Sequence, residues 1–124
     1  MKDHLIMIIE DEADLRDTIK EMLEISGFIV LTAENGREGL RLINEIGRPC
    51  LILLDLMMPV MNGWEFLERL KNTDEHALSD IPVTVTSAAA DVADVQRQYG
   101  CNVLKKPLSM ERLVALANEH CQSC

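Results

Sequence analysis

Five side chains that could bind a cation or a phosphoryl group each stand at or just beyond the end of a short apolar run. Glu10 and Asp11 follow residues 5–9, Asp55 follows residues 51–54, Ser87 follows residues 83–86, and Lys106 comes shortly after the pair 103–104. Together they provide three carboxylates, one hydroxyl and one ammonium group. Such a set suits phosphoryl chemistry, which depends mostly on positioning and on the neutralisation of charge.

Three carboxylates brought to one place are costly without a cation. Two unit charges about 4 Å apart repel by roughly 4 kcal/mol at an effective dielectric constant of about 20. Hard oxygen ligands on few protein groups, with room for water, favour Mg²⁺ or Mn²⁺ over softer metals. Lys106 would add a positive point charge. Asp55 stands alone after its apolar run, so it is the carboxylate best placed to attack phosphorus and form an acyl phosphate.

The chain repeats a unit in which a short apolar run is followed by a polar turn and then by apolar residues at helical spacing. Predicted strands cover residues 5–9, 28–32, 51–54, 83–86 and the short pair 103–104. Unbroken apolar strands that alternate with helices are typical of a parallel sheet covered on both faces. In such sheets the functional site lies outside the carboxyl ends of the strands, which is where the five candidate side chains stand.

The predicted helices have apolar faces and recognisable ends. The inward-facing residues are Leu15, Ile19, Met22 and Leu23 in the first helix, Leu40, Ile43 and Ile46 in the second, Trp64, Leu67 and Leu70 in the third, Val92, Val95 and Tyr99 in a shorter helix over 91–99, and Leu113, Leu116 and Ala117 in the last. Gly27 suits a left-handed end of the first helix. Asn35 and Ser109 are predicted to cap the second and the last helix.

The composition excludes several classes of protein. With 21 acidic and 12 basic residues the net charge is −9, which argues against direct nucleic-acid binding because that needs a basic face. No apolar run is long enough to span a bilayer, and the first residues lack the features of a secretory signal. We therefore expect a cytoplasmic protein with no membrane contact, folded as one domain over residues 1–124.

The four cysteines, at positions 50, 101, 121 and 124, do not have the spacing of a disulfide framework. Cys121 and Cys124 form a CxxC pair, but no second pair completes a zinc site. We interpret all four as ordinary thiols in a reducing compartment. The three histidines lie on predicted ends and loops and are interpreted as surface residues: His4, His76 and His120.

Four segments together resemble the receiver domains of response regulators. They are Ile9-Glu10-Asp11-Glu12, the pattern D-x-M-M-P-x-M-x-G over residues 55–63, residues 82–88 and Lys105-Lys106-Pro107. The resemblance covers the whole chain in order, and the segment 55–63 is highly specific by itself. It implies an α/β fold of the flavodoxin-like (βα)5 type, a three-layer sandwich whose five-stranded parallel sheet has the order 2-1-3-4-5.

The resemblance also implies a metal site made from the acidic residues. Glu10 and Asp11 are the acidic pair of the family, and Asp11 and Asp55 ligate Mg²⁺ together with the backbone carbonyl of Met57. Glu10 stands where the family more often has Asp. Its additional methylene group should change how a metal-bound water is held without abolishing metal binding.

The same resemblance implies that Asp55 accepts a phosphoryl group from a phosphohistidine on a histidine kinase or histidine phosphotransfer protein. Ser87, in place of the commoner Thr, hydrogen-bonds to that group, and Lys106 pairs with it. The Lys106–Pro107 peptide is expected to be cis, as in the family. The chain is then a signalling switch for a downstream protein and not an enzyme, apart from its own phosphorylation and dephosphorylation.

One position departs from the family in a way that bears on signalling. Three residues before the lysine the family usually carries Tyr or Phe, whereas this chain has Val103. A rotating aromatic side chain at this position therefore cannot report phosphorylation. We hypothesise that the signal passes through the loop after Ser87 and the predicted helix over 91–99.

Two other functions compete with this interpretation. A phosphohydrolase of the haloacid-dehalogenase kind also uses an Asp nucleophile, but it needs a second Asp two residues later, where this chain has Met57. A pseudo-receiver would bind partners without taking phosphate. Such proteins usually lose the nucleophile or a metal carboxylate, and this chain keeps both Asp55 and Asp11.

Overall fold

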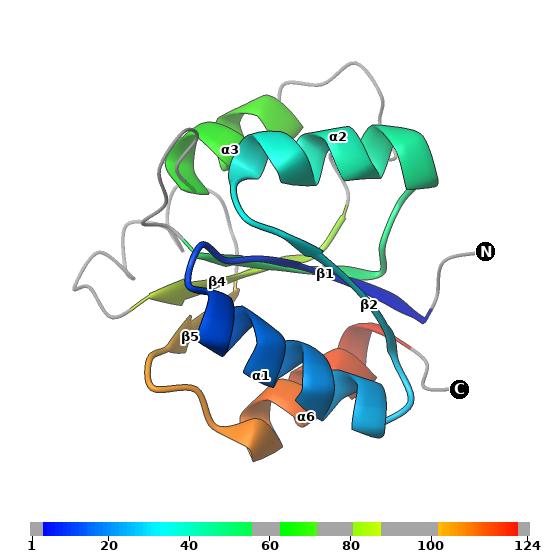
Figure 1. The fold of residues 1–124 in the computed structure, drawn as a ribbon, viewed down its shortest axis with the longest axis vertical. Coiled ribbons are helices and arrows are strands. Elements are labelled where there is room, and N and C mark those ends of the chain that lie inside the picture. Colours follow the sequence, from blue (N-terminus) through cyan, green and yellow to red (C-terminus); the bar gives the residue numbers. More distant parts are fainter. Residues whose placement is uncertain (1–3, 56–62, 72–80, 88–101, 122–124) are drawn as a thin grey trace.

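The strands form one parallel sheet, as the sequence predicts. The computed structural model describes residues 4–55, 63–71, 81–87 and 102–121 (Figure 1). The five strands are β1 (Leu5–Ile9), β2 (Ile29–Ala33), β3 (Leu51–Asp55), β4 (Val83–Ser87) and β5 (Asn102–Lys105). Their order in the sheet is β2-β1-β3-β4-β5, and all pairs are parallel. The predicted α/β fold and strand order are confirmed.

Helices cover both faces of this sheet, which gives three layers. The described helices are α1 (Ala13–Ile25), α2 (Gly36–Ile46), α3 (Gly63–Lys71) and α6 (Met110–His120). In Figure 1, α2 and α3 lie on one face, and α1 and α6 lie on the other. None of the helices in the described ranges is long and apolar enough to cross a membrane. The predicted helix over 91–99 lies outside the described residues.

The central strands are buried along their whole length. All residues of β1 and β3 are buried, whereas the edge strand β2 begins with the exposed Ile29. One core cluster packs the sheet against α2 and α3 and contains Phe66, which is fully buried. The other packs the sheet against α1 and α6 and contains Leu23 and Leu113. Burial on both faces explains the unbroken apolar sequence of these strands.

The predicted helix ends are found where the sequence places them. Gly27 adopts a φ of 97°, the left-handed conformation that glycine accepts without a clash after α1. Asn35 Oδ1 accepts a hydrogen bond from the Glu38 amide at 2.9 Å, and this caps α2. The side chain of Ser109 caps α6 in the same way.

One predicted core residue is exposed instead. Ile46 has the helical spacing of the inward face of α2, yet 39% of it is exposed, whereas Ile43 is buried. The physical reason is its position as the last residue of α2, directly before Gly47 turns the chain away with a φ of 116°. A helical pattern therefore overestimates burial at the end of a helix.

The interpretation of all four cysteines as ordinary thiols is wrong for two of them. Cys50 and Cys121 are joined by a disulfide, with their Cα atoms 5.5 Å apart. They are separated by 71 residues in the sequence, so no local spacing could indicate the pair.

His120, the residue before Cys121, is predicted from the sequence to be a surface residue. Its Nε2 atom is instead buried and has no hydrogen-bond partner among the described residues.

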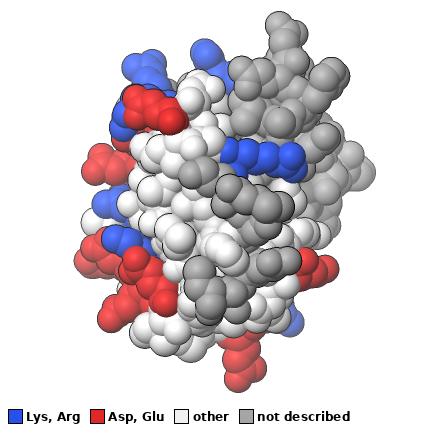
Figure 2. Space-filling model, turned by 90° about the vertical axis from the view of Figure 1, so that its right-hand side faces the viewer, with Lys and Arg blue, Asp and Glu red and all other residues white. Residues whose placement is uncertain are grey.

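Charged side chains of the described residues are unevenly spread over the side of the molecule on which the strands begin (Figure 2). The start of β1 lies on the right of Figure 1, and Figure 2 looks onto that side. Among the described residues, acidic side chains lie mostly toward its margins, whereas a basic side chain reaches across its upper half (Figure 2). The acidic cluster predicted from the sequence lies at the opposite ends of the strands.

Candidate functional site

The register of the sheet brings the ends of β1 and β3 to one edge. Ile9, the last residue of β1, pairs with Leu54, so that Glu10 and Asp55 are the next residues on two adjacent strands. Asp55 in turn pairs with Thr86 of β4. The carboxyl ends of adjacent parallel strands are the usual place for a functional site in an open α/β sheet.

Three carboxylates meet at this edge. Glu10, Asp11 and Asp55 each offer an oxygen, and these atoms all lie within 4.8 Å of one another. Glu10 and Asp55 are buried, at 2% and 5% exposure, whereas Asp11 is exposed. The cluster is therefore closed on the side of the sheet and open toward solvent at Asp11.

Lys106 follows β5 and reaches back to the same cluster. Its Nζ lies 3.0 Å from Oε1 of Glu10 and 3.7 Å from Oδ1 of Asp55. Burial lowers the pKa of Lys106, but the hydrogen bond with Glu10 and the charges of Asp55 and Glu10 outweigh it, so the pKa is raised. The ammonium group is thus held charged within a few ångströms of Asp55. The Lys106–Pro107 peptide is cis, as expected.

Burial makes the ionisation of the Glu10 carboxyl group costly. Burial, followed by the hydrogen bond with Asp55, raises its pKa to about 7, although its interaction with Lys106 lowers it in part. A buried carboxylate beside another carboxylate favours the neutral form. Near neutral pH and without a metal, Glu10 therefore shares its site with Asp55 as a partly protonated group.

The backbone of Glu10 is fixed from two sides. Its amide donates to the carbonyl of Ala33 at the end of β2, at 3.0 Å. Its carbonyl accepts a hydrogen bond from Nη1 of Arg16 in α1, also at 3.0 Å. No sequence pattern singles out Arg16, because an arginine on the first turns of a helix gives no sign that its side chain turns back to a strand end.

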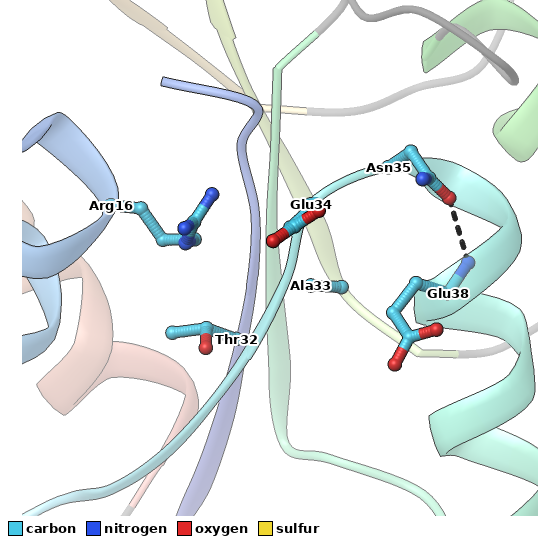
Figure 3. A pocket seen from close by; sticks show the side chains of 6 residues that line it. All are labelled: Arg16, Thr32, Ala33, Glu34, Asn35 and Glu38. Carbon is cyan, nitrogen blue, oxygen red and sulfur yellow. Dashed lines mark hydrogen bonds between the residues drawn. The ribbon is translucent and has the colours of Figure 1, made fainter. Parts of the chain in front are cut away.

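The two hydrogen bonds that hold the Glu10 backbone, to Ala33 and from Arg16, are called the backbone clamp. A polar cavity of about 360 Å³ lies beside it. Its lining residues are Arg16, Thr32, Ala33, Glu34, Asn35 and Glu38. Figure 3 shows Arg16 on one side, extending from α1, and Asn35 with Glu38 on the other side, at the start of α2. Arg16 therefore lines this cavity and at the same time donates a hydrogen bond to the Glu10 carbonyl.

The donor set fits a hard divalent cation. Fully ionised, the three carboxylates and the Lys106 ammonium carry a formal charge of −2, which one divalent ion neutralises. All three offered donors are carboxylate oxygens, the ligands preferred by Mg²⁺. Two predicted contributors lie beyond this description: Met57 falls outside the described residues, and Ser87 is described in its backbone alone, opposite Lys105.

An apolar groove of about 300 Å³ runs along α1 next to Lys106. Its apolar lining comes from Leu15, Ile19, Met22, Pro107, Leu108 and Leu113. Lys106 and Glu12 belong to the same lining. The groove therefore joins an apolar helix surface to the edge of the sheet at which the carboxylates meet.

Comparison with known proteins agrees with the fold and with this cluster. The chain matches the response regulator receiver domain family over residues 6–118. It is 37% identical over 112 residues to the polar-differentiation response regulator DivK of Brucella anthropi, covering 88% of this chain and 89% of DivK. It is 33% identical over 115 residues to a CpxR homolog of Haemophilus influenzae, described as a transcriptional regulatory protein, covering 89% of this chain but 47% of that protein.

Solved structures show the same relationship. The signal receiver domain of a signal transduction histidine kinase from Syntrophus aciditrophicus superposes with a TM-score of 0.81 at 30% identity, covering 94% of this chain and 88% of that one. The chain therefore belongs to the response regulator receiver domains of two-component signalling. Such domains act as signalling switches. The chain spans about half the length of several curated relatives that it matches.

Proposed function

We propose that Asp55 takes up a phosphoryl group from a phosphohistidine of a histidine kinase or histidine phosphotransfer protein, in a Mg²⁺-dependent reaction that switches the binding of a downstream protein. The observation that carries this proposal is the meeting of three carboxylates within 4.8 Å, with Lys106 Nζ at 3.7 Å from Asp55. A cluster of this kind is costly unless a cation and an anionic group complete it.

In this proposal a metal ion would be held by Asp11, Asp55 and the backbone carbonyl of Met57, with Glu10 completing the acidic cluster around it. Mg²⁺, or Mn²⁺ in its place, would neutralise charge on the phosphoryl group. Asp11 is the exposed member of the cluster, so an ion and its waters can enter from its side. Glu10 is buried and clamped by Arg16 and Ala33, which suits a group that must keep its orientation.

The transfer itself needs little beyond correct placement. A carboxylate oxygen of Asp55 attacks phosphorus, and the bond from phosphorus to the histidine nitrogen breaks, leaving its electron pair on the imidazole. Lys106, released from Glu10 and Asp55, pairs with the oxygens of the new acyl phosphate. Ser87 donates a hydroxyl hydrogen bond to the same group. Hydrolysis by water returns Asp55 to its carboxylate form.

The groove along α1 supports the docking of the phosphodonor. It is apolar, it lies beside Lys106, and Lys106 is 3.7 Å from Asp55. A helix of the donor that fills this groove with its apolar face would bring a histidine on the same helix toward Asp55. The groove that binds the phosphodonor and the acidic cluster around Asp55 would then form one continuous surface.

Two further parts of the proposal concern the chain as a whole. Residues 1–124 are proposed to be one domain, which the family match over 6–118 and the five-stranded sheet of the described residues support. The protein is proposed to act in the cytoplasm, as expected from its sequence. The signal is proposed to leave through residues 88–100, because Val103 cannot act as an aromatic switch. Hydrogen exchange with and without a phosphoryl mimic tests this, and unchanged protection of 88–100 contradicts it.

The phosphorylation itself is tested with acetyl phosphate and Mg²⁺, read by intact mass. We expect a gain of one phosphoryl group that requires Mg²⁺ and is lost in Asp55→Asn. The matched control is Asp17→Asn, which removes an exposed carboxylate of α1 and should leave phosphorylation unchanged. An unphosphorylated wild type would favour the pseudo-receiver, and phosphorylation that survives Asp55→Asn would refute the assigned acceptor.

A further inference from the structure

A pair of bonded cysteines, Cys50 and Cys121, lies at the opposite end of the sheet from the acidic cluster. Cys50 directly precedes β3, the central strand whose other end is Asp55. Cys121 is the residue that ends α6. The disulfide between them fastens the C-terminal end of α6 to the start of the central strand. In Figure 1 this red end of α6 lies on the side of the molecule where β1 begins.

Both cysteines have surroundings that suit the thiol as well as the disulfide. The Cys50 amide donates to the Leu5 carbonyl at 2.8 Å, and the Cys121 amide donates to the Ala117 carbonyl at 2.7 Å. Neither backbone bond depends on the link between the sulfur atoms. Sγ of Cys50 also lies 3.0 Å from the Leu5 carbonyl oxygen, so a thiol at this position has an acceptor for its proton.

We propose that Cys50 and Cys121 form a reversible thiol–disulfide modification site that reacts with low-molecular-weight disulfides such as oxidised glutathione. Cys50 is the more exposed of the two residues, since Cys121 is 6% exposed. The Cys50 thiolate attacks one sulfur of oxidised glutathione and forms a mixed disulfide, and a glutathione thiolate leaves. The Cys121 thiolate then attacks the Cys50 sulfur, the internal disulfide forms, and the second glutathione thiolate leaves.

The electrons and protons balance in this exchange. The protein loses two electrons and two protons, and one glutathione disulfide becomes two glutathione thiols. An excess of reduced glutathione drives the same steps in reverse. The site therefore follows the ratio of the two forms of glutathione and needs no metal or additional cofactor.

The modification acts on α6 and on the stability of the fold. A link between residues 71 positions apart restricts the unfolded chain and so stabilises the folded one. Leu113 and Ala117 of α6 share a core cluster with Leu23 of α1 and with Cys121 itself. Reduction should therefore loosen the last turns of α6 first. Glu10 and Asp55 lie at the other ends of the strands, so the metal site should not respond.

The test uses the full chain equilibrated in glutathione buffers of different ratios, then alkylated with N-ethylmaleimide and analysed by intact mass and peptide mapping. In oxidising buffer we expect two protected thiols and a linked peptide pair containing Cys50 and Cys121. Reduction should lower the melting temperature on the order of 10 °C. Cys50→Ala should abolish this redox dependence, while Cys101→Ala and Cys124→Ala should keep it.

Several outcomes would overturn the proposal. A linked pair of Cys121 and Cys124, or full alkylation of Cys50 in excess oxidised glutathione, would show that the site does not exist. An unchanged melting temperature, or a Mg²⁺ affinity that changes with redox state, would contradict its action on α6. If Cys50→Ala does not fold, the titration and peptide mapping of the wild-type chain decide the question alone.

Discussion

The two ends of the parallel sheet differ in what they bury. At the carboxyl end, Glu10 and Asp55 are buried together, with Lys106 as their cation. At the amino end, apolar side chains such as Leu5 and Leu51 are buried, and a disulfide joins the sheet to α6. Like charges in one place destabilise the fold, whereas buried apolar area stabilises it. The comparison indicates that stability at one end offsets the cost of the site at the other.

The largest effect should come from weakening the apolar end. Leu23 is fully buried between α1 and the sheet, so Leu23→Ala removes buried methyl groups and leaves a cavity. We expect the free energy of unfolding to fall by about 2–5 kcal/mol, measured by urea unfolding with the disulfide intact. The affinity for Mg²⁺ in the folded protein should stay the same. A large loss of Mg²⁺ affinity would show that the two ends are not independent.

The second-largest effect should be on how the stability of the metal-free protein depends on pH, because of the buried carboxyl group at the carboxyl end of the sheet. The pKa of Glu10 is raised by burial from 4.5 to about 7, so the folded state binds this proton more tightly than the unfolded state does. Stability from this group is fully present below pH 4.5 and is lost as the pH rises through about 7. The loss should be on the order of 3 kcal/mol at most.

Glu10→Gln isolates this contribution from those of the other acidic residues. Urea unfolding of the metal-free wild type and variant, repeated across this pH range, should show the variant gaining stability relative to the wild type as the pH rises. Saturating Mg²⁺ should remove most of the difference, because the ion favours the ionised carboxylate. A stability difference that does not depend on pH would contradict the raised pKa of Glu10.

A smaller effect is expected from the exposed carboxylate of the cluster. Asp11→Asn removes one negative charge from the proposed ligand set, and we expect Mg²⁺ affinity to fall at least about tenfold. Isothermal titration calorimetry measures this directly. Asp14→Asn, which changes an exposed residue in the first turn of α1, is the matched control. Equal affinity in Asp11→Asn and wild type would remove Asp11 from the proposed site.

The smallest effect should come from the backbone clamp. Arg16→Ala removes the hydrogen bond to the Glu10 carbonyl, which is expected to contribute about 1 kcal/mol. We expect Mg²⁺ affinity to fall by a few-fold, with partial rescue in Arg16→Lys, because a lysine can still donate to this carbonyl. Arg41→Ala, on the exposed face of α2, should bind Mg²⁺ like the wild type.

Much of the carboxyl end could be predicted from the sequence. Glu10 and Asp55 follow unbroken apolar strands, and the ends of parallel strands must meet at one edge of the sheet. The caps at Asn35 and Ser109 and the left-handed Gly27 also follow from local preferences of these residue types. In each case the cause lies within a few residues of the position concerned.

The amino acid sequence by itself determined the strands and helices of the described residues, because short-range periodicity controls them, and it placed the acidic residues at the ends of those strands. Only the tertiary structure decided that Cys50 bonds to Cys121, that Arg16 holds the Glu10 carbonyl, and that Lys106 pairs with Glu10. These contacts join elements that are distant in the chain or turn back on one another. Their distances depend on how helices pack on the sheet, which no local pattern encodes.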